Sequence, residues 1–179
     1  MIDVRGLYKS FEDKTVLSDI NASFENGKTN LIIGQSGSGK TVLMKCIVGL
    51  LTPEKGEVLY DGRNLVLMGK KEKKMLRKEM GMIFQSAALF DSMSVLDNVM
   101  FPLNMFSNDT LRDRTKRAMF CLERVNLTEA KDKFPGEISG GMQKRVAIAR
   151  AIALNPQYLF CDEPNSGLDP KTSLAVSYT

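Results

Sequence analysis

Histidine and tryptophan are both missing from this 179-residue chain, and cysteine occurs only three times. Without histidine, metal centres built on imidazole ligands and Ser-His-Asp chemistry are excluded. The cysteines, Cys46, Cys121 and Cys161, are widely spaced and odd in number. This usage favours reduced thiols in the protein core over disulfides or a zinc site.

Long apolar runs are missing as well. None approaches the roughly 20 residues that span a bilayer, and the polar start Met1–Arg5 is not a signal peptide. The 25 basic and 21 acidic residues are interspersed, so the net charge of +4 arises from no single block. This pattern favours neither a nucleic-acid partner nor a polybasic membrane anchor, and we expect a cytoplasmic protein. With 43% hydrophobic and 26% charged residues, the composition is that of one ordinary globular domain.

The most informative segment that is present is a glycine-rich loop, Gly34–Thr41, which fits the phosphate-binding pattern G-x-x-x-x-G-K-[ST]. Thr29–Ile33 before it predicts a buried strand, and Val42–Leu51 after it predicts an apolar helix. Strand, loop and helix are the context that the pattern requires. The members of the loop are Gly34, Gln35, Ser36, Gly37, Ser38, Gly39, Lys40 and Thr41.

This loop predicts a nucleotide phosphate site. Its backbone amides and the following helix N-terminus would bind phosphate oxygens. Lys40 would reach the β- and γ-phosphates, and the Thr41 hydroxyl would ligate Mg²⁺. A flexible glycine and serine loop is the alternative interpretation, which the flanking strand and helix disfavour.

The first 30 residues alternate apolar and polar positions around Ile2 and Val4, and again from Ile20 to Phe24, which predicts two strands. Phe11 falls in the loop expected between them. It is either a core aromatic or a platform on which a base stacks, because a flat aromatic face accepts a purine without specific hydrogen bonds. The residues alone leave both alternatives open.

The middle of the chain predicts a second ligand edge. Lys70–Glu79 predicts a charged helix with a solvated face, to which we assign no function. Met80–Phe84 predicts a buried strand ending at Gln85, and ligands bind at the carboxyl ends of strands in open α/β sheets. Ala87–Leu96 is apolar but has neither helical nor strand periodicity, so it is either core or a partner-binding groove. Leu111–Val125 predicts an amphipathic helix.

Ser139, Gly140 and Gly141 open another predicted helix, which offers a second anion site, with a plain helix cap as the alternative. The predicted strand Tyr158–Cys161 then runs into two adjacent carboxylates. Because adjacent side chains diverge, Asp162 suits a Mg²⁺ ligand, and Glu163 suits a base that activates water.

Taken in order, these motifs resemble the ATP-binding cassette (ABC) family of ATPases over the whole chain. The matching segments are Gly34–Thr41 as Walker A, Gln85 as the Q-loop, Ile138–Met142 as the signature, Tyr158–Glu163 as Walker B and Ser166–Asp169 as the D-loop. The resemblance implies an α/β fold, the P-loop NTPase fold of a RecA-like ABC cassette. It implies an antiparallel β part at residues 1–30 and 56–66, and a helical subdomain at about 90–150.

The resemblance also assigns roles, with ATP and Mg²⁺ as cofactors. It implies that Phe11 stacks on adenine and that Thr41, Gln85 and Asp162 serve the Mg²⁺ site. Glu163 would be the general base, with Gln85 near the attacking water. The signature residues Ser139, Gly140 and Gly141 would contact ATP held by the opposite protomer of a head-to-tail dimer.

Two segments resemble a narrower group, the ATPases of Mla/Mce-type lipid transporters. They are Ile138–Met142, with Met142 where most of the family has glutamine, and Phe84–Val99. This resemblance implies a subunit that powers phospholipid transport from the cytoplasmic face of the inner membrane. It also implies that the Gln85–Val99 region docks a transmembrane permease subunit, and it implies no nucleic-acid partner.

One departure concerns the end of the sequence. The family carries a switch histidine on a strand beyond the D-loop, whereas this sequence has no histidine and ends at Thr179, ten residues after Asp169. The C-terminal strands of the fold are therefore expected to be lacking, leaving strand edges unpaired. We expect a fragment or a prematurely ended gene product, whose activity the sequence leaves uncertain. The alternatives are a truncated nucleotide-binding module without hydrolysis and a soluble ABC ATPase outside transport.

Overall fold

The computed structural model describes residues 1–162. Glu163 and the D-loop segment Ser166–Asp169 lie outside the described residues. The chain divides into two compact units, residues 1–75 and 76–179. The division falls inside helix α2 (Lys70–Lys78).

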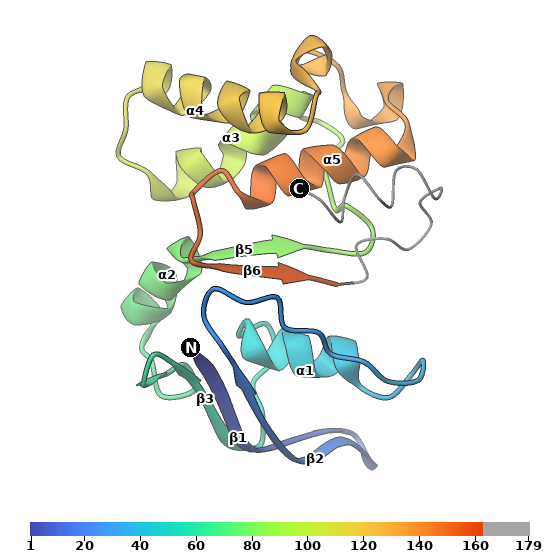
Figure 1. The fold of residues 1–179 in the computed structure, drawn as a ribbon, viewed down its shortest axis with the longest axis vertical. Helices are drawn as coiled ribbons and strands as arrows, with labels where there is room; N and C mark the ends of the chain where they lie inside the picture. The colour runs from blue at the N-terminus through green and yellow to red at the C-terminus, as the bar shows by residue number, and fades with distance from the viewer. Residues whose placement is uncertain (163–179) are drawn as a thin grey trace. The chain divides into compact units, whose positions relative to one another are not determined.

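The first unit is built on a four-stranded antiparallel sheet in the order β2-β1-β3-β4, of which Figure 1 labels β1, β2 and β3. Its strands are β1 (Ile2–Phe11), β2 (Lys14–Phe24), β3 (Lys55–Tyr60) and β4 (Arg63–Asn64). The apolar side of β1 buries Ile2, Val4 and Leu7, as the alternating pattern predicts. Helix α1 (Lys40–Ile47) packs beside β2 and ends before Gly49, whose φ of 73° terminates it earlier than the sequence predicts.

The prediction of a strand at Thr29–Ile33 is wrong. Residues 29–33 form no strand, and Leu31 and Ile33 are 81% and 82% exposed. Among the described residues, no strand pairs with this segment. A strand satisfies its backbone N–H and C=O groups only through neighbouring strands, so an apolar run without a neighbour stays irregular.

The second unit combines a short parallel pair with helices. Strand β5 (Met80–Ile83) pairs with β6 (Tyr158–Cys161) from Met80 opposite Tyr158 to Ile83 opposite Cys161. Helices α3 (Val95–Phe106), α4 (Leu111–Arg124) and α5 (Gly140–Ala151) lie to one side of the pair (Figure 1). Two short 3₁₀ helices, Thr128–Ala130 and Pro135–Glu137, connect α4 to α5. Within residues 1–162, no helix has the length and apolar character to cross a membrane.

The core of the second unit lies between its helices. Val99 of α3, Leu122 of α4 and Val146 of α5 are fully buried in it. The structure confirms the helices predicted from the sequence at α2, α4 and α5 and the strands predicted at β5 and β6. The sequence does not predict α3. Cys46 and Cys121 are buried, but Cys161 is exposed, so the expectation of core thiols is wrong for Cys161.

Candidate functional site

The glycine-rich loop lies at the N-terminus of α1, with residues 34–38 exposed. The backbone N–H of Ser38 donates to the Gln35 carbonyl at 3.2 Å, which closes a turn. The Lys40 ammonium donates to the carbonyl oxygens of Gly34 and Gln35 at 2.8 and 2.9 Å. A phosphate oxygen would replace these neutral acceptors with a charged one, and such a hydrogen bond is about twice as strong. Thr41 follows in the first turn of α1.

Gly39 is the residue at which the loop becomes a helix. Its φ of 93° is left-handed, a conformation that favours glycine. A Cβ atom added there would lie 3.1 Å from side-chain atoms of both Val16 and Leu17. Both the backbone conformation and the close approach of β2 therefore require glycine at this position.

Phe11 ends β1 and is 43% exposed, which rejects the core alternative for its ring. The Lys9 ammonium lies 5.3 Å from the ring centroid. Lys9 also donates to Glu54, and this hydrogen bond lowers the pKa of the Glu54 carboxyl group. Phe11 stands on the same β1–β2 hairpin whose Val16 approaches Gly39, so an exposed ring and the phosphate loop share one unit.

Gln85 and Asp162 follow the two parallel strands of the second unit. Ile83 opposes Cys161 in the register, and the Asp162 N–H donates to the Ile83 carbonyl at 2.9 Å. The two polar residues therefore leave the pair at the same carboxyl edge. Among the described residues, no cluster of three or more His, Cys, Asp or Glu side chains could hold a metal. Asp162 supplies one carboxylate at this edge, and Mg²⁺ sites in proteins commonly use one or two carboxylates together with substrate phosphates and water.

Ser139 caps α5, and its hydroxyl accepts a hydrogen bond from the Met142 N–H at 3.3 Å. Ser139 and Gly140 are exposed, and Gly141 is half-buried. The Gln143 side-chain amide donates to the Pro135 carbonyl at 2.9 Å and fixes the chain where the helix begins. The helix cap is therefore formed, at an exposed helix N-terminus of the kind that binds anions.

The loop after Gln85 is held by two residues that sequence reasoning missed. Asn98 is fully buried; its Oδ1 accepts from the Phe90 N–H at 2.8 Å. Its Nδ2 donates to the carbonyls of Phe90, Met93 and Ser94 at 3.0 to 3.2 Å. The sequence carries no distinct signal for Asn98, because its partners are main-chain groups.

Arg150 of α5 holds the same loop nearer to Gln85. Its two terminal nitrogens donate to the carbonyls of Ala87 and Ala88, each at 2.8 Å. Both alanines adopt left-handed φ values, 55° and 48°. Such a conformation is costly outside glycine and persists where surrounding contacts fix it. Arg150 is half-buried, and this burial lowers the pKa of its guanidinium group.

Replacing Asn98 with alanine is expected to lower the free energy of unfolding by about 2 kcal/mol, because buried carbonyl and N–H groups of the loop lose their partners. Urea denaturation of both proteins measures the difference. The matched control is Asn104→Ala on the same helix, where Asn104 is exposed and accepts a hydrogen bond from Arg114. Equal losses for the two variants would contradict the role of Asn98.

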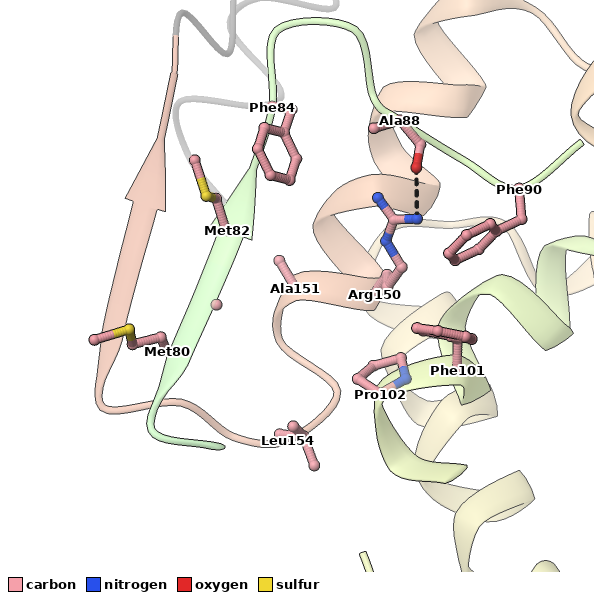
Figure 2. A pocket seen from close by; sticks show the side chains of 11 residues that line it. Met80, Met82, Phe84, Ala88, Phe90, Phe101, Pro102, Arg150, Ala151 and Leu154 are labelled. Carbon is pink, nitrogen blue, oxygen red and sulfur yellow. Dashed lines mark hydrogen bonds between the residues drawn. The ribbon is translucent and has the colours of Figure 1, made fainter. Parts of the chain in front are cut away.

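A cavity of about 270 Å³ opens beside this loop (Figure 2). The Phe90 and Phe101 rings meet there with centroids 4.6 Å apart, and the Arg150 guanidinium carbon lies 6.0 Å from the Phe90 centroid. The cavity is lined by Met80, Gly81, Met82, Phe84, Ala88, Phe90, Phe101, Pro102, Arg150, Ala151 and Leu154. The Gln85–Val99 region, for which the sequence left core and partner-binding groove as alternatives, contains residues of both kinds. Val95 and Val99 are buried in the core, whereas Phe90 is 40% exposed at the cavity.

Comparisons with known proteins identify relatives of the chain. Residues 17–166 match the family model described as ABC transporter. The chain is 43% identical over 176 residues to the probable ribonucleotide transport ATP-binding protein mkl of Mycobacterium leprae, covering 98% of this chain and 51% of that protein. It is 40% identical to the methionine import ATP-binding protein MetN of Legionella pneumophila, with coverage of 98% and 51%.

A third relative is the intermembrane phospholipid transport system ATP-binding protein MlaF of Haemophilus influenzae, 41% identical with coverage of 95% and 64%. The chain thus spans about half to two thirds of the length of these relatives. The dimeric structure of MJ0796, a bacterial ABC transporter cassette, matches with a TM-score of 0.92 and 32% identity, covering 99% of this chain and 80% of that one. A post-hydrolysis dimer of the same cassette, bound to ADP and Pi, matches with a TM-score of 0.91 and 31% identity.

Proposed function

Because the chain belongs to the ABC transporter family, we propose that it is the ATP-binding and ATP-hydrolysing subunit that powers a membrane transporter. The observation that carries this proposal is the phosphate loop, whose Lys40 ammonium is already held against the loop by the Gly34 and Gln35 carbonyls. Bound ATP would offer phosphate oxygens to Lys40 and to the N-terminus of α1.

The remaining residues of the site have proposed roles in binding and hydrolysis. Phe11 stacks on the adenine, which its exposed ring supports. Asp162, Thr41 and Gln85 would hold Mg²⁺, which would neutralise charge on the phosphates. Glu163 accepts a proton from the attacking water.

A head-to-tail dimer completes the proposed site. The solved relatives are described as dimeric, one of them bound to ADP and Pi. In such a dimer, the exposed N-terminus of α5, with Ser139, Gly140 and Gly141, contacts the γ-phosphate held by the other protomer. A helix N-terminus suits this role because its free N–H groups and partial positive charge favour anions.

The exposed part of the Gln85–Val99 region is the proposed docking place for the transmembrane subunit, on the cytoplasmic face of the membrane. Phe90 supports this proposal because it presents an aromatic ring at a cavity whose loop is fixed by Asn98 and Arg150. A preorganised loop loses little conformational freedom when a partner binds.

Phe90→Asp is expected to abolish co-purification with the membrane subunit and to leave ATP affinity unchanged, because a charge in the cavity mouth opposes an apolar partner. Affinity chromatography from detergent-solubilised membranes measures the association. The control is Phe120→Asp on α4, where the ring is 48% exposed and lies outside the cavity. Unimpaired association of the Phe90 variant would contradict docking at this loop.

Phospholipid is the proposed cargo of the complete transporter. The MlaF relative and the Mla/Mce-like signature Ile138–Met142 support lipid, whereas other relatives carry names for ribonucleotide and methionine transport. The test is ATP-dependent movement of a fluorescent phospholipid between vesicles by the assembled complex, with radiolabelled methionine and ribonucleotide uptake assayed in parallel. Uptake of either small molecule without phospholipid movement would reject the lipid assignment.

A further inference from the structure

Helix α2, which is labelled in Figure 1, carries six lysine and arginine residues among its nine, a concentration of positive charge that the balanced composition of the whole chain conceals. Four of its cations are exposed and two are half-buried. Only Leu76 is buried, so a narrow apolar contact holds the helix to the protein. The cations are Lys70, Lys71, Lys73, Lys74, Arg77 and Lys78.

The arrangement of these cations opposes the stability of the helix. Lys74 lies one turn from both Lys70 and Lys78, and like charges at this spacing repel one another. Lys70 and Lys71 also occupy the first turn, where the helix dipole disfavours positive charge. Within residues 1–162, none of the six cations forms an ion pair with a carboxylate.

Solubility alone does not account for this pattern, because a surface of mixed charge is equally well hydrated. Glu72, the single acid within α2, accepts a hydrogen bond from the Gly69 N–H at 2.8 Å and so serves the start of the helix. With six cations and one acid, the helix offers a predominantly positive surface. Such a surface is complementary to an external polyanion.

Apolar side chains accompany the charge. Met75, on the helix, is 57% exposed, and Leu67, three residues before its start, is 79% exposed. Cations combined with exposed apolar side chains suit a bilayer, where the cations meet anionic headgroups and the apolar groups enter the interface. Phosphates of a nucleic acid would use the cations but not Met75.

We propose that α2 binds the surface of an anionic lipid bilayer, with its lysines at the headgroups and Met75 at the interface. This function goes beyond the nucleotide site and does not depend on ATP hydrolysis. It gives the cassette a membrane contact of its own, in addition to the proposed docking loop.

The test is co-sedimentation of the purified chain with vesicles of phosphatidylcholine alone, or with phosphatidylglycerol as about one lipid in three. We expect binding only to the anionic vesicles and loss of binding as the salt concentration rises. The variant K70Q/K71Q/K74Q is expected to bind roughly 100-fold more weakly, since each lysine near a charged surface contributes a few-fold. The control K14Q/K116Q/K133Q removes the same charge from exposed positions outside α2 and should bind nearly as the unaltered chain does.

Three outcomes would overturn the proposal. If both triple variants bound the anionic vesicles equally weakly, the net charge of the protein, and not helix α2, would account for the binding. Tighter binding to single-stranded RNA than to anionic vesicles at the same salt concentration would make the partner a nucleic acid. A lower melting temperature for K70Q/K71Q/K74Q would show that the lysines support the helix, whereas relief of their repulsion predicts equal or greater stability.

Discussion

Replacing Glu163 with glutamine is expected to slow ATP hydrolysis by roughly 100- to 10,000-fold, the contribution of a positioned general base. Glutamine keeps the size of the side chain but cannot accept the proton of the attacking water. ATP binding should persist, because the phosphate loop and Lys40 are unchanged. The variant is therefore expected to accumulate as an ATP-bound dimer.

The measurement is phosphate release by the transporter reconstituted in vesicles, together with size-exclusion chromatography in ATP. Glu129→Gln serves as the control because Glu129 is an exposed glutamate in the 3₁₀ helix Thr128–Ala130. It should hydrolyse ATP at the unaltered rate. Hydrolysis by the Glu163 variant at a similar rate would remove Glu163 from the catalytic role.

Two apolar runs, Thr29–Ile33 and Tyr158–Cys161, show when a side-chain pattern is sufficient to predict a strand. Tyr158–Cys161 was predicted as a strand and forms β6 with the same bounds, because β5 lies beside it and completes its ladder. Thr29–Ile33 has the same kind of pattern and forms no strand. The side-chain pattern indicates a tendency to be buried, whereas a strand also needs a partner strand, which for β6 lies far away in the sequence.

Helix α3 escapes prediction from the sequence for a different reason. Its core side chains, Val95, Val99 and Leu103, follow helical spacing, but Pro102 interrupts the segment and the preceding loop has no period. The loop itself depends on Asn98 and Arg150, whose partners are backbone carbonyls. Such contacts leave no sequence motif, because any residue supplies a carbonyl.

The edge formed by Gln85 and Asp162 was predictable for a physical reason. Each follows a buried apolar run, and parallel strands bring their carboxyl ends to one edge. The exposure of Phe11 was not predictable, because an aromatic ring at a strand end is as compatible with burial as with a binding surface. The structure decides between these alternatives by placing the ring on the exposed end of the β1–β2 hairpin.

Lys40→Ala is expected to weaken ATP binding by about 1.5 to 3 kcal/mol, the range for a hydrogen bond to a charged group. This corresponds to roughly a 10- to 150-fold rise in the dissociation constant. Titration with a fluorescent ATP analogue measures it. Lys45→Ala, on the same helix but in its last turn, removes an equal charge away from the loop and should change the affinity little.

The hydrogen bonds of Lys40 within the phosphate loop must be considered when the effect of this substitution is interpreted. Lys40 already donates to the Gly34 and Gln35 carbonyls, so the substitution removes two internal hydrogen bonds as well as the phosphate contact. A loss of loop order alone would lower the melting temperature of the nucleotide-free protein and weaken all ligands of the loop alike. Loss of the phosphate contact should instead weaken ATP more than AMP, because Lys40 is assigned to the β- and γ-phosphates. Equal affinities of the folded variant and the unaltered chain for ATP would contradict the assignment of the phosphate site.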